Sequence, residues 1–71
     1  MRGARLRLNE STAQRIVRKH GGRFRAGEWD FATVESKIAA DALIEELRYF
    51  KFQVLRSPVD LGKGGWEVMF R

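Results

Sequence analysis

Positively charged side chains are concentrated near the start of this chain, and their chemistry is that of anion binding. Residues 1–25 hold eight Lys or Arg and one acid, a net charge of +7, whereas residues 26–71 have a net charge of −2. Guanidinium and ammonium groups donate hydrogen bonds to phosphate oxygens, and each contact releases condensed counterions. The pattern predicts a one-sided electric field that attracts an anionic macromolecule. The candidate nucleic-acid contacts are Arg5, Arg7, Arg15, Arg18, Lys19, Arg23 and Arg25.

Groups for catalysis or metal binding are scarce. The chain has no Cys and a single histidine, His20. Thiolate nucleophiles, disulfides and zinc–thiolate sites are therefore excluded, and no Ser–His–acid pattern or metal-ligand cluster is present. His20 precedes two glycines at an expected helix end, where capping carbonyl groups or edging the core is its predicted role. We expect a binding protein that is not an enzyme and needs no cofactor or metal.

The length and composition favour one folded domain covering residues 1–71. A hydrophobic content of 44% with two Trp and five Phe is too rich for a disordered basic tail. No apolar run approaches the ~20 residues of a membrane-spanning helix, and the N-terminus lacks the apolar core of a signal peptide. With no Cys, the chain also suits a reducing compartment. We expect a cytoplasmic protein with no membrane partner.

The elements that position the arginines can be read from local patterns. Residues 5–8 alternate Arg and Leu, which predicts a strand with both arginines on one face. Ser11, followed by Gln14, predicts a capping box at a helix start, and the glycines at 21–22 end that helix. Arg15 and the basic residues at i+3 and i+4 from it form one face of this helix.

Residues 23–34 predict a hairpin with a two-residue turn at Gly27-Glu28. In that register Arg25 faces Asp30 and Phe24 faces Phe31. Arg23 and Arg25 then lie on one face. The opposite face would hold Phe24, Ala26, Trp29, Phe31 and Thr33.

The second half predicts a helix and two further strands. Ser36 caps a helix with an apolar stripe from Ala39 to Phe50. A strand containing Phe52 and Val54 stops at Pro58, a Gly-rich turn follows, and the last strand places Trp66, Val68 and Phe70 on one face.

The resulting order, β-α-β-β-α-β-β, predicts an α+β ferredoxin-like sandwich with two helices on one face of an antiparallel sheet. The last strand either extends the sheet or forms a C-terminal hairpin. The open face would carry Arg5, Arg7, Arg23 and Arg25, with the aromatic side chains beneath the helices. Bases would then find no stacking surface, so phosphate contacts are expected to dominate. On the later strands Leu55, Met69 and Arg71 form a candidate protein interface, which includes a possible homodimer.

From about Asp30 to Phe70 the chain resembles the sporulation-related repeat (SPOR) domain, a ferredoxin-like glycan binder. Lys51 stands where those domains commonly have Gly. The residues that carry the resemblance are Ala39-Ala40-Asp41-Ala42-Leu43, Leu47, Phe52-Gln53-Val54 and Gly64-Gly65-Trp66.

Three functions therefore stay open. The first is nucleic-acid binding through phosphates. The second is a protein-binding adaptor or inhibitor, of the kind small mobile elements encode, that acts on an acidic partner. The third, implied by the SPOR resemblance, is glycan binding. The alternative to nucleic-acid binding is that the arginines only make the surface soluble and that Arg25 pairs with Asp30 across the hairpin.

Overall fold

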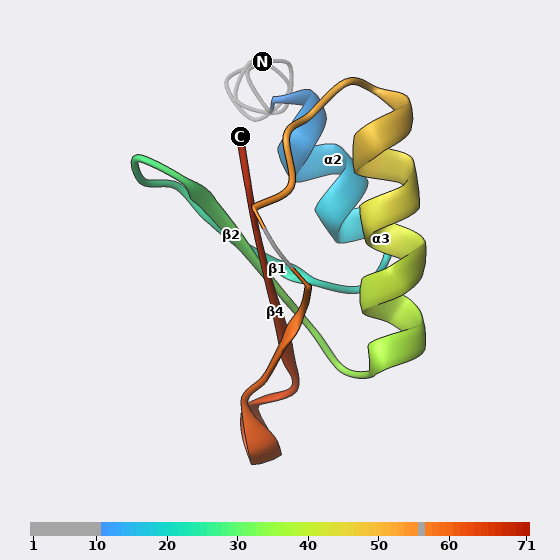
Figure 1. Ribbon diagram of the computed structural model, residues 1–71, viewed down its shortest axis with the longest axis vertical. Helices are drawn as coiled ribbons and strands as arrows, with labels where there is room; N and C mark the ends of the chain where they lie inside the picture. Colours follow the sequence, from blue (N-terminus) through green and yellow to red (C-terminus); the bar gives the residue numbers. More distant parts are fainter. Residues whose placement is uncertain (1–10, 56) are drawn as a thin grey trace, which may run out of the picture.

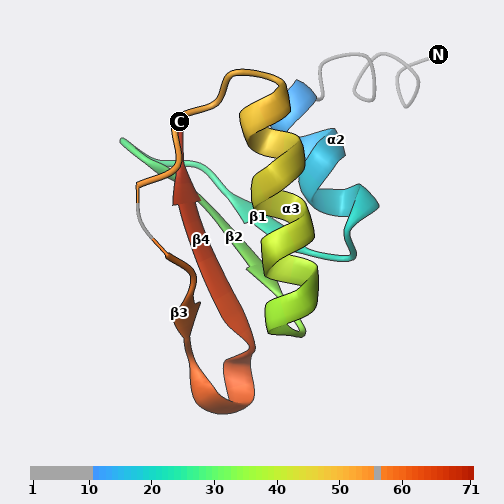
Figure 2. The same cartoon turned by 45° about the vertical axis from the view of Figure 1, so that its right-hand side comes forward.

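Two helices cover one face of a four-stranded antiparallel sheet in the computed structural model, which describes residues 11–55 and 57–71 (Figure 1). Figure 2 shows both helices on the same side of the sheet. The strand order across the sheet is β1-β2-β4-β3. In chain order the elements are α2 (Thr12–Lys19), β1 (Arg23–Arg25), β2 (Asp30–Val34), α3 (Lys37–Tyr49), β3 (Val59–Asp60), the 3-10 turn η1 (Gly62–Gly64) and β4 (Trp66–Phe70).

The predicted helix signals are confirmed. The Ser11 hydroxyl accepts a hydrogen bond from the Gln14 N–H at 3.1 Å, and the Gln14 side chain accepts one from the Ser11 N–H at 2.9 Å. This capping box satisfies two N–H groups that would otherwise lack partners at the start of α2. The helix ends at Gly21, whose φ of 75° is a conformation that glycine adopts at little cost. Ser36 caps α3 in the same way as Ser11 caps α2, with its hydroxyl accepting from the Ala39 N–H.

The core lies between the helices and the covered face of the sheet. The apolar stripe of α3 contributes Leu43 and Leu47, both fully buried, as the sequence predicts. Opposite them, Ala32 of β2 pairs with Val68 of β4, and neither has any exposed surface. Phe70 completes this layer. Its ring lies edge-on to Phe52 and tilted against Phe24. Within residues 11–55 and 57–71, the buried residues are Ala13, Ile16, Val17, Ala32, Val34, Ala40, Leu43, Ile44, Leu47, Val68 and Phe70.

The predicted register of the hairpin is wrong by one residue. Arg25 pairs with Phe31 and Phe24 with Ala32, so the turn before β2 covers residues 26–29 and is longer than the two-residue turn expected at Gly27-Glu28. The Asp30 carboxylate accepts the Gly27 N–H within this turn, at 3.4 Å. Because side chains alternate along a strand, a shift of one residue moves the whole set to the other face. The helices pack on Ala32 and Val34, and Phe31 therefore points to the opposite face.

The last strand lies inside the sheet. β4 pairs with β2 along its whole length, and on its other side it pairs with β3 and, through a bridge at Val54, with residues 53–55. The final strand thus both extends the sheet and forms a hairpin with β3. A ferredoxin-like sheet would place the strand expected at residues 5–8 between β2 and the strand expected at Phe52 and Val54, and β4 occupies that position. The ferredoxin-like order is not confirmed, and residues 5–8 lie outside the described residues.

Gly65, just before β4, packs against the end of β2 at a position where only glycine fits. Its φ is 92°, and an added Cβ would collide with the carbonyl oxygen of Val34. The turn over residues 61–65 therefore serves close strand packing.

Candidate nucleic-acid interface

The face of the sheet opposite the helices carries its side chains in rows across the strands. One row runs from Arg25 through Phe31 and Met69 to Leu55, as the strand register and the Leu55 N–H to Met69 carbonyl bond show. The next row contains Arg23, Thr33, Glu67 and Val59. We call this surface the open face. Phe31 lies at its centre, flanked by a cation on the edge strand and by the Met69 thioether on β4.

Two arginines lie over aromatic rings at the open face. The Arg25 Cζ atom is 4.5 Å from the centre of the Phe31 ring, and the Arg71 Cζ atom is 4.3 Å from the centre of the Trp29 ring. The negative face of an aromatic ring attracts a guanidinium, which fixes the position of both groups. The expectation that these aromatic rings lie beneath the helices is therefore wrong for Phe31 and Trp29. It holds for Phe24, which packs against the core.

Five of the seven predicted nucleic-acid contacts fall on two different surfaces. Arg23 and Arg25 are exposed on β1 and, as predicted, point away from the helices. The other three belong to α2, on the helix side of the sheet: Arg15, Arg18 and Lys19. Arg5 and Arg7 lie outside the described residues. The structure thus brings Arg23, Arg25 and Arg71 together on one side and does not add the α2 cations to that face.

The cross-hairpin ion pair between Arg25 and Asp30 is not formed. Within residues 11–55 and 57–71 the ion pairs are Lys19 to Glu46, His20 to Glu46 and Lys37 to Asp41. The carboxylate in these two rows is that of Glu67, and Thr33 separates it from Arg23. The two described rows thus hold two guanidinium groups and one carboxylate, and Arg71 adds a third guanidinium over Trp29.

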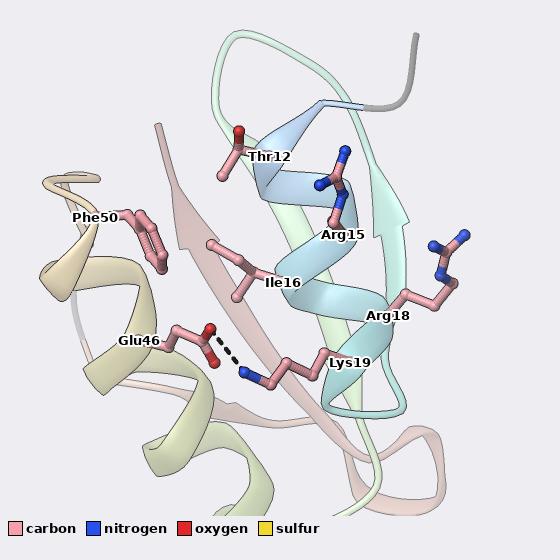
Figure 3. Close-up of a pocket in the computed structure, with 7 residues that line it drawn as sticks. All are labelled: Thr12, Arg15, Ile16, Arg18, Lys19, Glu46 and Phe50. Carbon is pink, nitrogen blue, oxygen red and sulfur yellow. Dashed lines mark hydrogen bonds and ion pairs between the residues drawn. The ribbon is translucent and has the colours of Figure 1, made fainter. Parts of the chain in front are cut away.

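A groove of about 570 Å³ separates α2 from α3 on the other side of the molecule (Figure 3). Ile16 forms its floor and Phe50 one wall. Figure 3 shows Lys19 reaching across the groove to Glu46, with the ammonium nitrogen 3.1 Å from the carboxylate, whereas Arg18 extends away from α3. The charge of Lys19 is thus compensated within the fold, and this residue is a helix-to-helix contact.

Glu46 also accepts a hydrogen bond from His20, with 2.7 Å between Nε2 and Oε1. The sequence predicts that His20 caps carbonyl groups or edges the core; in the structure its side chain joins the end of α2 to Glu46 of α3. The hydrogen bond from His20, followed by that from Lys19, holds the pKa of the Glu46 carboxyl below its ordinary value of 4.5. A lowered carboxyl pKa means that the folded protein prefers the ionised form.

This preference predicts an acid-dependent loss of stability. The contribution of Glu46 to the free energy of unfolding is fully present above pH 4.5, the ordinary value, and is lost as the pH falls through the lower pKa of the folded state. Thermal melts of the wild type and Glu46→Gln over this range would measure it. We expect the wild type to be the more stable at neutral pH and the difference to shrink in acid. A difference that stays constant with pH would contradict the assignment.

The Gly-rich turn offers little to a phosphate. The N–H of Gly62 donates to the Asp60 carboxylate at 2.8 Å, and the N–H groups of Gly64 and Gly65 donate to carbonyls inside the turn. These bonds are those of the Gly-rich turn that the sequence predicts before the last strand.

The residues of the candidate protein interface lie on the open face. Leu55 is 41% exposed and lies beside Met69. Arg71 is also exposed, and its guanidinium covers Trp29. These residues therefore share the open face with Arg23 and Arg25, and their role as a protein interface stays a prediction.

The sequence analysis did not place Phe31 and Trp29 on the open face. The signal that could have found them is the run Ala32-Thr33-Val34: a small and a branched apolar residue alternate there, which suits the covered side of a strand beneath a closely packed helix. That reading would have moved Phe31 to the opposite face.

No family model matches this chain, and no curated protein or solved structure is significantly similar to it. The SPOR resemblance of residues 30–70 stays a prediction. Among the described residues, no group of three or more His, Asp or Glu is placed to hold a metal ion. None of the described helices is long and apolar enough to cross a bilayer.

Proposed function

We propose that this protein binds nucleic acid and that the open face of its sheet is the contact surface. The observation that carries the proposal is the gathering of Arg23, Arg25 and Arg71 on a face that neither helix covers. Arg25 and Arg71 are 46 residues apart in the sequence, so the fold and not the sequence order brings their charges together. The mode of action is binding, without catalysis.

The guanidinium groups act on the phosphate backbone. Each presents a planar set of N–H donors that matches two phosphate oxygens, and each contact displaces counterions from the nucleic acid. In the free protein Arg25 and Arg71 lie over Phe31 and Trp29, which keeps both guanidinium groups at the open face. Contacts of this type carry affinity and orientation but no sequence information.

Salt dependence tests the proposal directly. Three phosphate contacts predict a slope of about −2 to −3 for the logarithm of the binding constant against the logarithm of salt concentration. Fluorescence anisotropy of labelled DNA and RNA oligonucleotides, titrated with the protein between about 50 and 200 mM salt, would measure this slope. Absent binding, or binding that does not change with salt, would contradict the proposal.

A second candidate function is binding to an acidic protein, as an adaptor or inhibitor would. The exposed Leu55 beside Met69 and Arg71 supports it, because an apolar pair rimmed by arginine is a common interface composition. Recovery of one acidic protein from a nuclease-treated lysate, together with no affinity for oligonucleotides, would favour this function over the first.

A further inference from the structure

We propose that the open face binds single-stranded nucleic acid by stacking bases on Phe31 and Trp29. This inference rests on the proposed function and adds the class of nucleic acid and two contact residues that carry no charge. It follows from the observed hairpin register, which turns Phe31 outward, and from the position of Trp29 beneath Arg71.

The two rings lie at the same end of the open face. Phe31 is in β2, and Trp29 is in the turn just before this strand, two residues earlier. The Trp29 ring is located by Arg71, which lies over it and follows Met69, the partner of Phe31 in β4, by two residues. Both rings are half-buried. Two aromatic rings on one face offer stacking positions for bases.

The arginines over the rings supply the second half of the contact. In the free protein Arg25 lies over one face of the Phe31 ring and Arg71 over one face of the Trp29 ring, with Cζ 4.5 Å and 4.3 Å from the ring centres. An exposed cation–π contact is weaker than a base stacked on an aromatic ring. A base can therefore replace the guanidinium on the ring, and the long arginine side chain can turn to the adjacent phosphate. Each arginine–aromatic pair thus supplies both a stacking surface for a base and a cation for a phosphate.

Charge and shape favour a single strand over the other occupants. The bases of a duplex are paired and stacked inside it, so their planes cannot reach Phe31 or Trp29. A second copy of this sheet, packed about a twofold axis, would bring the same arginine-rich patch against itself. Binding to an acidic protein would account for the positive charge of Arg23, Arg25 and Arg71. It would not account for the two aromatic rings on the same face.

The test compares single-stranded and duplex oligonucleotides of the same sequence, about 12 nucleotides long. Phe31→Leu and Trp29→Leu remove a ring and keep an apolar side chain. We expect each to weaken single-strand binding about tenfold, the effect of losing one base–aromatic stack, with no change in the salt slope. Duplex affinity should stay unchanged. Tyr49→Leu is the matched control, because Tyr49 is 77% exposed on α3 and lies away from the open face.

Two further measurements separate stacking from a structural effect. Phe31→Tyr keeps the ring and should retain wild-type affinity, and thermal melts should show that all variants are folded. In a Trp66→Phe background, which leaves Trp29 as the reporter, oligo(dT) should quench the tryptophan fluorescence. Each of these results supports stacking.

The outcomes distinguish the two proposals. If the protein binds with a clear salt slope but Phe31→Leu and Trp29→Leu have no effect, or if duplex binds as tightly as single strand, the stacking inference is overturned and the proposed function stands. If no oligonucleotide binds at any salt concentration, both are overturned. Self-association that is lost in Phe31→Leu, without oligonucleotide binding, would also overturn both and would assign the open face to a second copy.

Discussion

Reversing the charges of Arg23 and Arg25 together, as Arg23→Glu with Arg25→Glu, is expected to lower nucleic-acid affinity by at least about 100-fold. A hydrogen bond to a charged group contributes about 1.5 to 3 kcal/mol, or roughly tenfold or more in affinity, and two such contacts are lost. The introduced carboxylates also repel the phosphates. The fold should persist, because both side chains are exposed on the edge strand β1. Anisotropy titrations at one fixed salt concentration would measure the loss, and circular dichroism would report the fold.

The matched control changes the net charge by the same amount elsewhere. Lys37→Glu with Arg48→Glu places both reversals on exposed positions of α3, which lies on the other side of the sheet. This variant should lose much less affinity, since only its contribution to the overall electric field changes. Equal losses in the two double variants would show that net charge matters and that the open face does not.

The local elements of the fold are predictable from the sequence because their signals are local. Ser11 with Gln14, Ser36 and the glycines after α2 each specify a helix end through bonds to neighbouring residues. The apolar stripe that contains Leu43 and Leu47 likewise specifies which side of α3 is buried. These features need no knowledge of the rest of the chain.

The sheet order and the hairpin register are not local, and here the sequence prediction fails. Gly27-Glu28 fits a two-residue turn equally well in isolation. The longer turn is selected by packing: α3 leaves room for Ala32 and Val34 beneath it, and β4 supplies Val68 and Phe70 as their neighbours in the core. The pairing of β2 with β4 joins segments more than thirty residues apart, and no turn signal encodes it.

This difference explains which site residues the sequence identifies. Arg23 and Arg25 flank Phe24, and a strand with one aromatic between two arginines exposes the arginines in either register of the hairpin. Phe31 and Trp29 follow the turn, so their face depends on its length. Arg71 joins the arginines of β1 only through the order β1-β2-β4.

Truncation of the core side of α3 is expected to cost much of the stability of the domain. Leu47 is 0% exposed, so Leu47→Ala removes buried methyl groups and leaves a cavity between α3 and the sheet. Such changes reduce the free energy of unfolding by about 2 to 5 kcal/mol, a large part of the total in a domain of this size. Chemical denaturation or thermal melting would measure it.

Leu61→Ala is the control for this experiment, because the same atoms are removed from a side chain that is 42% exposed in the turn before β4. Its effect should stay within about 1 kcal/mol, as is usual for surface positions. Equal effects of the two substitutions would mean that α3 does not pack on the sheet through Leu47. That result would also contradict the placement of Phe31 on the open face, because this placement depends on the burial of Ala32 and Val34 against the helices.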